Sequence, residues 1–123
     1  MWRPTGSSSW PVSGAGAASV GGHYRHTLDH FFPLLPPKPD QILDYDLRGR
    51  SLELETSRTA ALTATQKLLT EAEQLDSGSL DQPLRVRCSV SQDSVSPVVQ
   101  SSLAREVMYA EIHAVHHFAI IRI

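Results

Sequence analysis

Apolar residues recur at helical spacing in two long stretches of the chain. Between residues 56 and 75 they fall three and four positions apart, which predicts a helix with one buried stripe and Thr56 as its N-cap. A second helix of this kind is predicted to begin after Ser101 or Ser102, either of which can cap it, and to run to the end of the sequence. The first stripe comprises Ala61, Leu62, Thr65, Leu68, Leu69, Ala72 and Leu75, and the second comprises Leu103, Val107, Ala110, Ala114, Phe118 and Ile121.

A third helix is predicted nearer the start of the chain. Ser19 is a suitable N-cap for it, and the proline pair at 36–37 ends any helix that precedes it. Pro33 permits only a strained last turn, so the regular part is expected to close within residues 31–32. Residues 36–55 are predicted to form a polar connection to the next helix.

The segment between the second and third of these helices in chain order has a different periodicity. Residues 83–90 alternate between apolar and polar side chains, which predicts a half-buried strand. Residues 91–97 are expected to turn the chain, and residues 98–99 to return as a short strand. The fold class predicted from these patterns is mostly α, with three helices and a small β-hairpin before the last helix. The strand residues predicted to face inward are Leu84, Val86, Cys88 and Val90.

Length and composition are those of one small globular domain. The chain has 123 residues, of which 41% are hydrophobic and 20% are charged. Residues 1–17 are rich in glycine and serine and are expected to be a disordered segment, leaving residues 18–123 as the domain. The net charge of −2 argues against nucleic-acid binding and against a polybasic membrane-binding surface, because either requires a cationic face.

Cysteine content and hydropathy bear on the cellular compartment. Cys88 is the single cysteine, so an intramolecular disulfide and a cysteine-rich zinc site are both impossible. Serine, glycine and proline interrupt every candidate secretory signal near the start, and no run approaches 18 apolar residues. We therefore expect a cytoplasmic location.

The histidines are the candidate functional residues. All six lie in two clusters separated by more than eighty residues. His113 and His117 stand at i and i+4 on one helix face, a spacing that lets two imidazoles share one divalent ion. The first cluster can supply a third ligand, whereas His23 and His116 are expected to be solvent-exposed. The full set is His23, His26, His30, His113, His116 and His117.

Two acidic residues accompany these clusters. Asp29 is placed to hold the second ring nitrogen of His26 and so to fix its tautomer, or else it is a surface charge. Glu106 lies two turns before His113 and is interpreted as a supporting hydrogen-bond partner, a general base, or a favourable charge in the first turn of its helix. No residue is assigned a catalytic role from the sequence.

Three segments resemble the DinB-like (YfiT-like) four-helix-bundle superfamily of metalloproteins. They are SVGGHYRHTLDHF, YDLRGRSLELET and SSLAREVMYAEIHAVHHFAII, which together span most of residues 18–123. The resemblance implies an up-and-down bundle, incomplete at both ends, with His26, His113 and His117 binding a divalent ion and His30 as the second choice for the first ligand. The ion would be nickel, zinc or iron, since imidazole suits all three.

The resemblance also carries functional expectations. It implies metal-dependent hydrolase or thiol-transferase chemistry. The alternatives are a non-enzymatic helical interaction protein, or a truncated variant without catalytic activity. An incomplete bundle leaves one apolar face open, so a homodimer or a partner helix is expected to cover it.

Overall fold

The computed structural model describes residues 19–47, 49, 51–87, 89 and 96–122. Within them the chain is mostly helical with a small three-stranded mixed sheet, which confirms the predicted fold class at that level. The expectations for residues 1–17, Cys88 and Val90 lie outside the described residues. The elements in chain order are α1 (Val20–Phe31), β1 (Ile42–Asp44), α2 (Leu52–Thr56), α3 (Arg58–Glu73), α4 (Ser77–Leu80), β2 (Pro83–Arg87), β3 (Val98–Ser102) and α5 (Leu103–Arg122).

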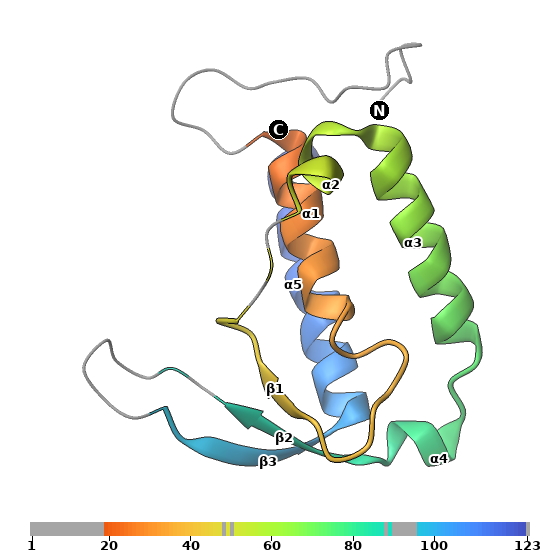
Figure 1. Ribbon diagram of the computed structural model, residues 1–123, viewed down its shortest axis with the longest axis vertical. Helices are drawn as coiled ribbons and strands as arrows, with labels where there is room; N and C mark the ends of the chain where they lie inside the picture. The colour runs from red at the N-terminus through yellow and green to blue at the C-terminus, as the bar shows by residue number, and fades with distance from the viewer. Residues whose placement is uncertain (1–18, 48, 50, 88, 90–95, 123) are drawn as a thin grey trace.

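Helices α1 and α5 form the centre of the structure. They run antiparallel, so that the beginning of α1 lies beside the end of α5, and α3 stands to one side of this pair (Figure 1). The sheet lies across the end of the helices at which α5 begins (Figure 1). This arrangement brings residues from the two ends of the sequence into contact along the α1–α5 interface.

Helix α1 begins and ends where the sequence predicts. The Ser19 hydroxyl oxygen accepts a hydrogen bond from the Gly22 amide at 2.9 Å, and the helix closes at Phe31, ahead of Pro33. Gly22 is buried against α2, where an added Cβ would lie 3.4 Å from a carboxylate oxygen of Glu55. The missing side chain therefore lets α2 pack closely on the first turn of α1.

The sheet contains one strand more than the predicted hairpin. Its order is β1-β2-β3, with β2 antiparallel to β3 and β1 parallel to β2. Leu84 and Val86 are buried as the alternation predicts. Strand β1 has only three residues, which is too short to show an alternating pattern, so it could not be predicted from periodicity.

The predicted stripe of α3 is only partly correct. The helix begins at Arg58 with Ser57 as its N-cap, because the short helix α2 occupies Thr56 and the residues before it. Ala61 and Leu68 are buried, whereas Leu62 and Leu69 are 56% and 55% exposed. At about 100° per residue these two leucines lie on the flank of the stripe, away from the face that packs on α1 and α2.

An apolar cavity lies between α1, α3 and α5. Its volume is about 290 Å³, and its lining includes Tyr24, Leu28, Leu68, Val107 and Phe118. Phe118, predicted to be in the core stripe of the last helix, is 46% exposed beside this cavity. Figure 1 shows α3 standing to one side of the α1–α5 pair, and side chains of all three helices line the cavity.

The outer face of α5 is apolar and exposed. Met108, Ile112 and Val115 are 55%, 63% and 69% exposed, at the spacing of one helix face. The homodimer or partner helix expected from the sequence stays a prediction, as does the expected absence of nucleic-acid binding. None of the helices described in the structure is long and apolar enough to cross a membrane.

Candidate metal centre

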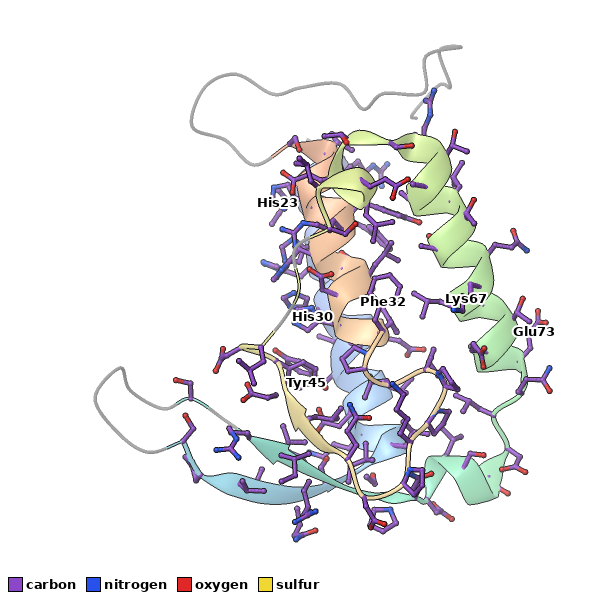
Figure 2. The ribbon with its side chains drawn as sticks, in the orientation of Figure 1. His23, His30, Phe32, Tyr45, Lys67 and Glu73 are labelled. Atoms are coloured by element: carbon purple, nitrogen blue, oxygen red, sulfur yellow. The ribbon has the colours of Figure 1, made fainter. Side chains whose placement is uncertain are left out.

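All six histidines gather along the interface of α1 and α5. Ring contacts connect them in a continuous row, from the exposed His116 to the buried His30. Figure 2 labels two of the histidines on α1, His23 near the start of the helix and His30 near its end. The antiparallel packing of the two helices therefore unites the two histidine clusters, as the sequence predicted.

Three of these histidines form a compact triad. One ligand nitrogen from each of His26, His30 and His113 lies within 4.8 Å of the others. The ring centroids of His30 and His113 are 4.0 Å apart, and that of His26 is 4.9 Å and 5.0 Å from them. Nitrogens on one tetrahedral ion are about 3.3 Å apart, given metal–nitrogen bonds of about 2.0–2.1 Å. Binding of one ion by all three histidines therefore requires side-chain rotations that bring the ligand nitrogens up to about 1.5 Å closer together.

The orientation of His30 favours metal binding. Its Nδ1 atom is 2.9 Å from the backbone carbonyl oxygen of His26. A carbonyl oxygen can only accept, so Nδ1–H donates and the neutral ring carries its lone pair on Nε2. Metal-bound histidines are commonly held by such a hydrogen bond from the second ring nitrogen. His30 is also only 3% exposed, so its ring is fixed by packing.

A buried carboxylate, Glu106, supports the His30 side of the triad through Tyr45. Glu106 accepts hydrogen bonds from the Tyr45 hydroxyl at 2.6 Å and from the Ser101 hydroxyl at 2.7 Å. The Tyr45 ring stacks on the His30 ring, with centroids 5.5 Å apart, and Figure 2 shows the two side chains together. Glu106 therefore positions Tyr45 against the triad. It lies in the first turn of α5, as expected from the sequence, and its action on His113 or as a general base stays a prediction. Tyr45 was not foreseen because no helix or strand pattern marks its position.

Asp29 has a structural partner on its own helix. It is buried and forms an ion pair with Arg25, which also donates to a carboxylate oxygen of Glu55 at 3.1 Å. The interpretation of Asp29 as a surface charge is therefore wrong, because its side chain is buried and paired with Arg25. Its proposed action on the tautomer of His26 stays a prediction.

The structure places the predicted ligands His26, His113 and His117 next to one another. His26 and His113 belong to the triad, and the His117 ring lies 4.8 Å and 4.5 Å from their rings. The Nδ1 atom of His117 faces Nδ1 of His23 at 3.0 Å. The residue that completes the compact triad is His30, the second choice from the sequence, and His117 as a ligand of the same ion stays a prediction. His116 is exposed as expected, whereas His23 is half-buried.

The histidine row should make stability depend on pH. Burial lowers the pKa of His117 from its ordinary value of 6.5, and the neighbouring His113, His23 and His116 lower it further. Between the folded-state pKa and 6.5 the unfolded chain binds more protons, so the free energy of unfolding rises with pH through that window and is fully recovered above it.

We therefore expect the free energy of unfolding of the metal-free protein to fall as the pH drops below 6.5. Urea denaturation at successive pH values measures this change. His117→Gln should flatten this part of the profile, and His116→Gln should alter it much less. A profile that His117→Gln leaves unchanged would show that protonation of His117 is not the cause.

The fold and the histidine row define a mostly helical protein with a candidate metal centre, and comparison with known proteins gives one specific similarity. FK506-binding protein 5 of Rhizopus delemar is 38% identical to this chain over 82 residues. The match covers 66% of the chain but 21% of that protein, so the chain spans about a fifth of the relative's length. No family model matches the chain, and no solved structure matches it.

This similarity corrects the family expected from the sequence. The chain shares a region with an FK506-binding protein 5, and the DinB-like assignment is wrong. The hydrolase, thiol-transferase, interaction-protein and truncated-variant expectations were attached to that assignment and are withdrawn with it. The proximity of the histidines is independent of the family assignment, since it rests on the interatomic distances in the structure.

Proposed function

We propose that this chain binds one divalent transition-metal ion through His26, His30 and His113. The observation that carries the proposal is the approach of three ligand nitrogens to within 4.8 Å of one another, although His30 on α1 and His113 on α5 are more than eighty positions apart in sequence. Three imidazoles suit zinc, nickel or iron and leave at least one coordination position for water or another ligand.

The surroundings of the triad support binding. The hydrogen bond from His30 Nδ1 to the His26 carbonyl presents Nε2 as the ligand atom, and Tyr45 stacks on the outer side of that ring. Both interactions restrict the His30 ring before an ion arrives. A restricted ligand loses less conformational entropy on binding, which favours affinity.

Titration with Co²⁺, followed by its visible absorption, tests the ligand set. The wild-type chain should take up one tightly bound equivalent, and His26→Ala, His30→Ala and His113→Ala should each weaken this step by roughly tenfold or more. His116→Ala, a histidine in the same row with an exposed side chain, is the matched control and should bind as the wild type does.

Circular dichroism of each metal-free variant establishes that it is folded before its affinity is compared. The proposal fails if folded triad variants bind as tightly as the wild type. It is also wrong in its choice of third ligand if His117→Gln abolishes the tight step and His30→Ala does not.

The name of the relative supplies a second candidate, which is binding of FK506. The cavity between α1, α3 and α5 supports it in being apolar, as ligand pockets mostly are, but its volume of about 290 Å³ lies below the range of about 300–1,000 Å³ that is typical of such pockets. It ranks second because the chain matches about a fifth of that protein. Thermal melts with and without FK506 compare the two candidates, and a rise of several degrees with FK506 in the metal-free protein would reverse the order.

A further inference from the structure

A second pair of imidazole nitrogens lies beside the triad in a more accessible position. The Nδ1 atoms of His23 and His117 are 3.0 Å apart, although 94 positions separate the two residues in the chain. Their ring centroids are 5.2 Å apart. Both side chains are half-buried, whereas His30 at the other end of the row is almost wholly buried. The pair therefore lies next to the exposed end of the row, at His116, and away from the buried His30.

The separation of these two nitrogens matches that of two ligands on one ion. With metal–nitrogen bonds of about 2.0–2.1 Å, two imidazole nitrogens are about 2.9 Å apart at a right angle and about 3.3 Å apart in a tetrahedron. The observed 3.0 Å lies within this range, so the two nitrogens already have a suitable separation, and the rings must turn so that both lone pairs point at one ion. In the metal-free protein one ring donates its Nδ1–H to the other ring. For both Nδ1 atoms to bind a cation, the donor ring takes its other neutral tautomer, with the proton on Nε2, so both rings stay neutral and no net proton is released.

We propose that His23 and His117 form a second site for a divalent transition-metal ion, weaker than the triad. Two protein ligands leave the remaining coordination positions to water, which accounts for a lower affinity than that of three histidines. The ligands are distinct from His26, His30 and His113. The inference therefore goes beyond the proposed function, and each of the two sites can be tested separately.

Calorimetric titration of the full chain with Zn²⁺ at pH 7.5 tests this site. The wild type should bind two ions in two steps, with the second step roughly tenfold or more weaker than the first. His23→Ala and His117→Gln should each remove the weaker step and retain the tight step, with the larger change in tight-step affinity in His117→Gln, because the His117 ring lies 4.5 Å from that of His113. His30→Ala should do the reverse, and His116→Ala should retain both steps.

The possible results separate the two proposals. A wild-type chain that binds a single ion overturns the second site, as do His23→Ala and His117→Gln variants that both retain two steps. Loss of the tight step in His117→Gln also overturns it, because His117 would then belong to the tight site. A weak step that His23→Ala removes, in a chain without any tight step, would support the pair and contradict the triad.

Discussion

Replacing Leu103 by alanine should lower the free energy of unfolding by about 2–5 kcal/mol. Leu103 is fully buried at the point where β3 continues into α5, and its amide donates to the Gln82 carbonyl oxygen at 2.9 Å. The smaller side chain leaves a cavity where the sheet meets the helical pair, and the surrounding residues can fill it only in part. Urea denaturation of the metal-free protein measures the change.

The matched control for this prediction is Leu62→Ala. Leu62 is the same residue type on α3 but is 56% exposed, so its truncation should change the free energy of unfolding by less than about 0.5 kcal/mol. Equal losses in the two variants would contradict the described core, because they would mean that Leu62 is as well packed as Leu103.

Metal binding to the triad should raise the melting temperature by an amount on the order of 10 °C. An ion present at about 100 times its dissociation constant, and bound only by the folded chain, adds roughly 2.7 kcal/mol of stability. In a chain of this size each kilocalorie raises the melting temperature by several degrees. The comparison is between melts recorded by circular dichroism with EDTA and with added Zn²⁺.

His113→Ala should lose most of this increase, and His116→Ala should keep it. The two histidines lie on the same helix three residues apart, so the comparison separates the metal site from a general effect of removing an imidazole from α5. A metal-dependent increase that persists in folded His26→Ala and His113→Ala variants would place the stabilising ion elsewhere.

Much of the helical framework could be predicted because it depends on local signals. Ser19 and Ser102 act as helix caps, each accepting a hydrogen bond from an amide three residues later. The alternation that buries Leu84 and Val86 also belongs to one short segment. Such signals need no knowledge of the rest of the chain.

The elements that the sequence did not reveal depend on contacts between distant segments. Strand β1 is defined by pairing with β2, as in Leu43 opposite Val86, and not by any pattern of its own three residues. The exposure of Leu69 on α3 likewise depends on which neighbours cover that helix. Helix propensity and spacing describe one segment at a time, so they cannot decide such cases.

The histidine site depends partly on local signals and partly on contacts between distant segments. Spacing on each helix correctly indicated that His113 and His117 share a face, but the third partner depends on the alignment of α1 against α5. One helical turn separates His26 from His30, and their rings both lie near His113 in the structure. The support from Tyr45 and Glu106 depends on the unpredicted segment around β1.

The most direct test of the metal centre is X-ray absorption at the zinc edge, with one equivalent of Zn²⁺ bound to the wild-type chain and to His30→Ala. The spectra count the imidazole ligands around the ion. Binding through His26, His30 and His113 predicts three imidazoles in the wild type and one fewer in the variant. An ion without imidazole ligands, or a ligand count that His30→Ala leaves unchanged, would contradict the assignment of this triad.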